Sequence, residues 1–64
     1  MKKDTLSLFI KEYTLLQENN NEELLAMFSS RWNYLFREYG YYNIRPYSVL
    51  YTSKLIIQKC SQKV

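Results

Sequence analysis

Histidine is absent from this 64-residue sequence, and cysteine, glycine and proline occur once each. Histidine is the commonest general base and the usual base of a hydrolytic triad, so the sequence lacks the residue that ordinarily fills these two catalytic roles. The single cysteine, Cys60, cannot form an internal disulfide, which excludes a disulfide-stapled extracellular scaffold. One cysteine without histidine does not make a zinc site, and one glycine does not make a phosphate-cradling loop. We therefore expect no metal and no cofactor.

The few reactive groups that remain do not combine into a catalytic site. Cys60 stands between Lys59 and Ser61, with no base beside it to activate the thiol, and falls on a predicted apolar face. Glu22 and Glu23 are adjacent, so on a helix their side chains point about 100° apart. They suit the first turn of a helix, where carboxylates complement the macrodipole. The sequence predicts a protein that is not an enzyme.

Long hydrophobic runs are also missing. No stretch approaches the roughly 18–20 apolar residues that cross a bilayer. The first four residues resemble the start of a signal peptide, but the following apolar stretch is broken by polar residues and has no small-residue cleavage site. We expect a cytoplasmic protein with no membrane partner. Abundant Lys, Asn, Ile and Tyr suit an AT-rich genome, such as that of a low-GC bacterium or its phage.

What is present is apolar and aromatic material, with uneven charge. Apolar residues make up 47% of the chain and aromatic residues 17%, enough for a core in one small domain spanning residues 1–64. Residues 1–23 carry three basic and five acidic side chains, a net charge of −2. Residues 24–64 carry six basic and one acidic side chain, a net charge of +5. Such asymmetry favours an acidic partner for the second half.

The first segment, residues 4–18, has the period of an amphipathic helix with Asp4 as its N-cap. The residues on its main apolar face are Leu6, Phe9, Ile10, Tyr13 and Leu16. Leu8 and Leu15 lie nearly opposite that face, seven residues apart and one above the other. This second stripe predicts self-association, with a homodimer as the simplest form. The alternative is that both are exposed leucines without a role.

The second segment is a helix with a signal at each end. Asn20 is a candidate cap with Glu23 in the capping-box position, and Gly40 follows the predicted last residue, Tyr39. Met27 and Tyr34 widen the apolar arc on one side. The arc itself contains Leu24, Leu25, Phe28, Trp32, Leu35, Phe36 and Tyr39.

The third segment, residues 47–63, fits two structures. A helix capped by Ser48 would place Val49, Leu50, Ser53, Ile56, Ile57 and Cys60 on one face. Residues 48–52 and 54–58 are also rich in β-formers, but no Asn-Gly or Asp-Gly turn joins them. The pattern favours an all-α, small three-helix domain. The alternative is two helices followed by a β-hairpin.

Eight aromatic side chains lie between Trp32 and Tyr51, more than a small core can bury with every tyrosine hydroxyl partnered. Tyrosine, tryptophan and arginine also dominate binding hot spots. We therefore predict a partner-binding surface of Tyr34, Tyr39, Tyr41, Tyr42, Arg45 and Tyr47. The alternative is that Tyr39, Tyr41 and Tyr47 close one end of a thin core.

The basic second half supports a different hypothesis. Basic side chains interleaved with tyrosines can grip a phosphate backbone while the rings stack on bases. The candidate nucleic-acid contacts are Arg31, Arg37, Arg45, Lys54, Lys59 and Lys63. This density of charge is ordinary, and no helix-turn-helix, zinc-finger or RNP-type motif is present.

Two functions follow from these patterns. The favoured one is a small regulatory protein that binds, and inhibits or modulates, a larger protein through an aromatic and arginine surface. The second is a small nucleic-acid-binding regulator of transcription or recombination that uses the basic second half.

Overall fold

The fold is known from a computed structural model, which describes residues 2–61. Its elements, in chain order, are α1 (Lys3–Glu18), α2 (Glu22–Arg31), α3 (Asn33–Glu38), a 3₁₀ turn η1 (Pro46–Ser48) and α4 (Val49–Ser61). No strand occurs among the described residues, so the predicted all-α class is confirmed and the hairpin alternative is wrong.

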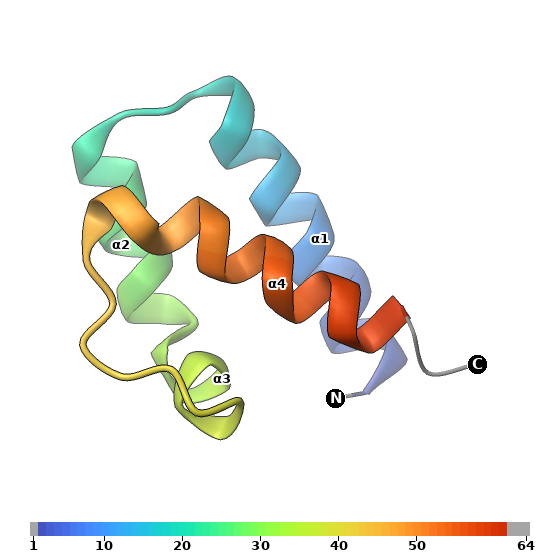
Figure 1. Cartoon of the computed structure of the whole chain (residues 1–64). Coiled ribbons are helices and arrows are strands. Elements are labelled where there is room, and N and C mark those ends of the chain that lie inside the picture. The colour runs from blue at the N-terminus through green and yellow to red at the C-terminus, as the bar shows by residue number, and fades with distance from the viewer. Residues whose placement is uncertain (1, 62–64) are drawn as a thin grey trace.

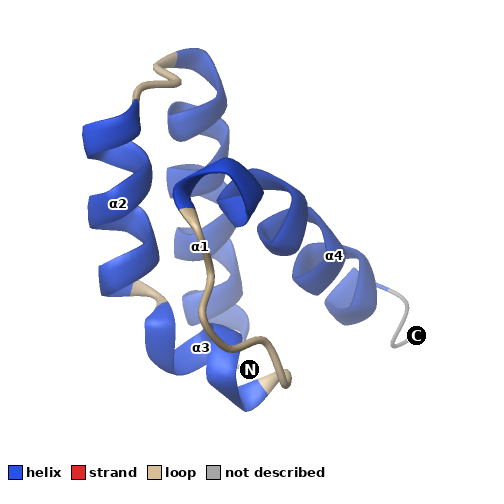
Figure 2. Cartoon of the chain, turned by 60° about the vertical axis from the view of Figure 1, so that its left-hand side comes forward, coloured by secondary structure: helices blue, strands red, loops and turns tan. Residues whose placement is uncertain are grey.

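The helices surround one core. Helices α1 and α2 form an antiparallel hairpin, α3 turns away at the far end of α2, and α4 crosses the hairpin at an angle (Figure 1). The connection between α3 and α4 runs back along the molecule to reach the start of α4 (Figure 2). The hairpin therefore has one side covered by α4 and one side that no other element covers.

Aromatic rings fill the centre of the core. Phe9 is fully buried, and its ring centroid lies 5.5 Å from that of Phe28, 5.0 Å from Trp32 and 6.3 Å from Phe36. The Trp32 and Phe36 rings meet Phe9 edge-on, an arrangement that aromatic pairs favour. These four rings join α1, α2 and α3 in one cluster, so the hydrophobic face predicted for each segment is confirmed at its centre.

Helix α4 closes the core with smaller side chains. Val49 and Ile56 are fully buried, and Leu50, Ile57 and Cys60 are partly buried against the core. The fully buried Ser53 has its hydroxyl satisfied, because Oγ donates to the Val49 carbonyl at 2.7 Å. The predicted helical face of this segment is thus confirmed from Val49 to Cys60, and residues 62–63 of the predicted helix lie outside the described residues.

Three predicted N-caps are wrong. Helix α1 begins at Lys3, one residue before its predicted cap Asp4, which lies in the first turn where its charge suits the macrodipole. The cap of α2 is Asn21, not Asn20, and its side chain accepts from the Leu24 amide at 2.9 Å. Ser48 does not cap α4. It closes η1 instead, its hydroxyl accepting from the Arg45 amide and donating to the Arg45 carbonyl.

The predicted second helix is interrupted at Trp32. This residue has φ −103° and ψ 14°, in the sparsely populated bridge region, and separates α2 from α3. Ser29, Ser30 and Asn33 around the break are poor helix formers. The Trp32 indole also has a distant partner, since Nε1 donates to Glu12 Oε1 at 3.1 Å. Phe28 and Phe36, on either side of the break, and Trp32 at the break all contact the Phe9 ring.

The predicted end of this segment at Gly40 is confirmed. Gly40 has φ +87°, the left-handed conformation that favours glycine after a helix. The Gly40 amide donates to the Arg37 carbonyl and the Tyr41 amide to the Phe36 carbonyl, the two bonds of a Schellman motif. This cap fixes the direction in which the connection leaves α3.

Candidate binding surfaces

Two of the predicted partner-binding tyrosines bind α4 of their own chain. Both Tyr39 and Tyr41 are partly buried against the core. The Tyr39 hydroxyl lies 3.1 Å from Sγ of Cys60, and Nζ of Lys59 donates to the Tyr41 hydroxyl at 3.2 Å. The same ammonium lies 5.1 Å from the centre of the Tyr41 ring. These contacts fasten the start of the connection to α4, as expected if these tyrosines close the core.

The Tyr39–Cys60 contact predicts a change of stability at high pH. That hydrogen bond first, then burial and the charges of Cys60 and Glu38, raise the pKa of Tyr39 from 10.0 to about 12. Between these values the unfolded chain binds fewer protons than the folded one, so the free energy of unfolding falls as pH rises. We expect Tyr39→Phe to flatten this fall, measured as urea midpoints in steps of pH. An unchanged slope would show that Tyr39 titrates normally.

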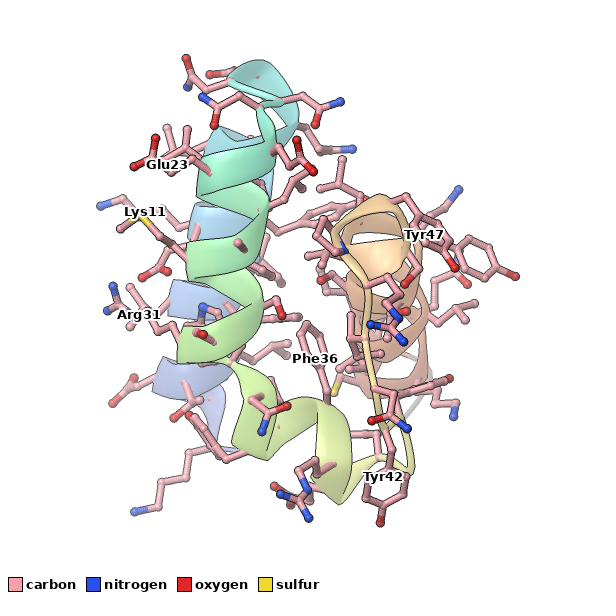
Figure 3. The ribbon with its side chains drawn as sticks, turned by 90° about the vertical axis from the view of Figure 1, so that its left-hand side faces the viewer. Lys11, Glu23, Arg31, Phe36, Tyr42 and Tyr47 are labelled. Carbon is pink, nitrogen blue, oxygen red and sulfur yellow. The ribbon has the colours of Figure 1, made fainter. Side chains whose placement is uncertain are left out.

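Tyr34 and Tyr42 are more exposed and lie against other side chains of α3 and its surroundings. The Tyr34 ring stacks at 6.1 Å from Trp32, and the Arg37 guanidinium carbon lies 5.6 Å from the centre of the Tyr42 ring. Tyr42 and Tyr47 mark opposite ends of the connection between α3 and α4 (Figure 3). The predicted tyrosines therefore do not form one continuous patch.

The most exposed rings lie at the start of α4. Tyr47 is 87% exposed and Tyr51 66%, and their spacing of four residues places them on one side of η1 and α4. Arg45 and Lys54, both exposed, flank them in the sequence. We call Arg45, Tyr47, Tyr51 and Lys54 the tyrosine surface. Tyr51 was not among the predicted contacts. Its spacing of four residues from Tyr47 could have predicted it, because residues four apart lie on the same side of a helix.

The predicted nucleic-acid contacts are spread over the molecule. Arg31 pairs with Glu12 across α1 and α2 at 3.2 Å, and lies at the opposite edge from Tyr47 (Figure 3). The Arg37 guanidinium lies over the Tyr42 ring, and the Lys59 ammonium donates a hydrogen bond to the Tyr41 hydroxyl. In the described part of the chain neither Arg45 nor Lys54 is in an ion pair. Lys63 lies outside the described residues.

A groove of about 350 Å³ lies between α1 and α2, and none of the residues that line it belongs to α4. The buried Leu16 and Phe28 line it together with three exposed side chains, Leu15, Leu24 and Met27. The Glu12–Arg31 ion pair and Asn19 are also part of its lining. Leu15 is therefore one of three exposed apolar side chains that line the groove.

Leu24 and Met27 correct the predicted apolar arc of the second segment. Leu24 was placed on its core face and Met27 at its edge, yet Met27 is 61% exposed and Leu24 is exposed as well. The large Phe28 and Trp32 rings occupy the space between the helices, so the residues beside them are left outside. Ile10 of α1 is likewise exposed, although its spacing placed it on the core face.

Comparison with known proteins adds no relative to this description. No family model, curated protein or solved structure matches this chain. Within residues 2–61 no three His, Cys, Asp or Glu side chains gather where they could hold a metal ion. The same residues contain no helix of the length and apolar character needed to span a bilayer. The described residues contain two candidate contact surfaces, the tyrosine surface and the groove.

Proposed function

We propose that this chain is a small non-enzymatic regulator that binds a larger protein through the tyrosine surface and thereby inhibits or modulates it. The observation that carries the proposal is the exposure of Tyr47 and Tyr51 side by side at the start of α4. Tyrosine supplies a large, amphipathic contact area with few rotatable bonds, so little conformational entropy is lost when it is fixed against a partner.

The backbone under this surface is held in place before any partner binds. At one end of the connection, Tyr39 and Tyr41 contact Cys60 and Lys59 of α4. At the other end, two hydrogen bonds link the Ser48 hydroxyl to the Arg45 backbone. A pre-ordered surface loses less freedom on association, which favours affinity. A cytoplasmic setting and self-association through Leu8 and Leu15 belong to the same proposal.

The spread of the basic side chains favours a protein over a nucleic acid as partner. Binding to a phosphate backbone calls for several cations along one tract. Here Arg31 is engaged with Glu12 at the edge opposite Tyr47, and Lys59 is engaged with Tyr41. Among residues 2–61, Arg45 and Lys54 are the two candidate cations beside the exposed rings, so the nucleic-acid function has two described cations there.

We expect the purified protein to show no tight binding to duplex DNA. Labelled duplex would be titrated at roughly 50 and 200 mM salt and followed by fluorescence anisotropy, because phosphate-driven binding changes steeply over that range. Binding that is strong at low salt, collapses at the higher salt and is lost in Arg45→Ala and Lys54→Ala would contradict the proposal. It would establish the nucleic-acid-binding regulator instead.

A further inference from the structure

The outer face of the hairpin carries charge in a regular order on both helices. On α1, Lys11, Leu15 and Glu18 follow at helical spacing, and on α2, Glu23, Met27 and Arg31 lie four residues apart. We call these six residues the hairpin face. All six are exposed, and Leu15 and Met27 border the groove.

Because α1 and α2 are antiparallel, the two rows of charge run the same way in space. Glu18 and Glu23 lie near the turn that joins the helices, and Lys11 and Arg31 lie further from it. Glu23, Lys11 and Arg31 follow one another down one edge of the molecule (Figure 3). Each row is therefore acidic near the turn, apolar in the middle and basic at the far end.

We propose that a second copy of this chain covers the hairpin face, related to the first by a two-fold axis that crosses both helices near Leu15 and Met27. Such an axis reverses the direction of the helices, so the acidic end of one copy meets the basic end of the other. Lys11 of each copy then lies opposite Glu18 of the other, and Glu23 opposite Arg31. Arg31 keeps its ion pair with Glu12 of its own chain, but its side chain is 63% exposed and its guanidinium has further N–H donors for Glu23. A two-fold interface needs this self-complementarity, since each contact occurs twice.

The apolar residues fit the same arrangement. Leu15 and Met27 lie at the middle of their rows, so in the dimer they meet their own counterparts near the axis, over the groove. Methionine adapts its shape to irregular gaps, which suits a residue that packs against its own copy. The result is four helices in two stacked layers, with an apolar centre and a charged rim at the interface, the usual anatomy of a protein interface.

Glu18 gives a separate reason for a cation at this place. It is the last residue of α1, where the helix dipole disfavours negative charge, and the last turn contains no basic residue. Lys11 of the second copy would offset both the carboxylate and the dipole. The face is also remote from Tyr47, which lies at the opposite edge (Figure 3). A dimer would thus present two tyrosine surfaces pointing away from each other, able to hold two partner molecules.

Sedimentation velocity over micromolar to millimolar concentrations tests whether the chain dimerises and by which face. We expect a reversible dimer. Met27→Glu should raise the dimer dissociation constant by about a hundredfold or more, since it places two carboxylates at the axis. Gln58→Glu introduces the same charge at an exposed position of α4 outside both the hairpin face and the tyrosine surface, and should leave dimerisation unchanged. Circular dichroism confirms that both variants keep their helices.

The two-fold pairing itself is tested by mixing two charge variants. Lys11→Glu places like charges opposite each other in its own dimer, as does Glu18→Lys, so each alone should weaken dimerisation about tenfold. When the two variants are mixed, both opposed pairs become attractive. We therefore expect a mixed dimer with the affinity of the unaltered protein, detected by native mass spectrometry with one variant isotope-labelled.

Two results would overturn the proposal. One is a chain that stays monomeric at every concentration. The other is a dimer that Met27→Glu leaves intact, or whose two charge variants show no preference for each other, because it must then use another surface. Neither result bears on the tyrosine surface, which is tested separately by partner binding.

Discussion

Phe9→Ala is expected to remove most of the stability of the domain at room temperature. Phe9 is fully buried and touches the rings of Phe28, Trp32 and Phe36, so its removal opens a cavity where α1, α2 and α3 meet. Truncating a buried phenylalanine costs about 3–5 kcal/mol. A single core in a chain this small rarely supplies more than about 3–5 kcal/mol in total. The two ranges coincide, so the free energy of unfolding should fall to about zero, where roughly half of the molecules are unfolded.

Urea unfolding followed by far-ultraviolet circular dichroism measures this effect. Leu8→Ala is the matched control at a protein concentration at which the chain is monomeric, because Leu8 precedes Phe9 on the same helix and is exposed. It should change the free energy of unfolding by no more than about 0.5 kcal/mol. Phe9→Leu, which keeps most of the volume, should fall between the two. A Phe9→Ala variant as stable as Leu8→Ala would mean that the aromatic cluster is not the centre of the core.

Ser53→Leu is expected to have the second largest effect. Ser53 is fully buried on α4 among larger core residues, where only a small side chain fits. Adding the atoms of leucine to a filled site forces side chains off their rotamers or shifts the helix, at about 1–3 kcal/mol. That is a large part of the stability of a domain of this size. We expect a clearly lower urea midpoint with the helical signal retained in water.

Ser53→Ala separates crowding from the loss of the hydroxyl. Ser53 Oγ donates to the Val49 carbonyl of its own helix, a bond that serine makes at some cost to helix geometry. Alanine removes that bond and is a better helix former, so the two effects nearly cancel and the free energy of unfolding should change by less than about 1 kcal/mol. Equal losses in Ser53→Ala and Ser53→Leu would show that the hydroxyl matters and the space does not.

The features that could be predicted from the sequence depend on residues close together in the chain. The period of apolar residues located the helical segments and their buried faces at Phe9, Phe28 and Ile56. Gly40 marked the end of the second segment, because a left-handed residue after a helix favours glycine strongly. Cap positions were less certain, since three consecutive asparagines offer equivalent side chains and only the surrounding backbone selects Asn21.

The features that could not be predicted depend on residues distant in the chain. The break at Trp32 accompanies the bond of its indole with Glu12, twenty positions away. The burial of Tyr39 and Tyr41 depends on their contacts with Cys60 and Lys59 of α4, which lie about twenty positions further along the chain. Leu24 and Met27 look like core residues by spacing, and only the bulk of the neighbouring rings leaves them at the groove.

The most direct test of the proposed function places a photo-crosslinking phenylalanine derivative at Tyr47 or Tyr51 in the cells that make the protein. The substitution keeps an aromatic ring at each site, and Gln17, an exposed residue of α1 outside both surfaces, is the control position. We predict one crosslinked protein of defined mass at both tyrosines and none at Gln17. Crosslinks to nucleic acid alone, or the same products at all three positions, would contradict a protein-binding tyrosine surface.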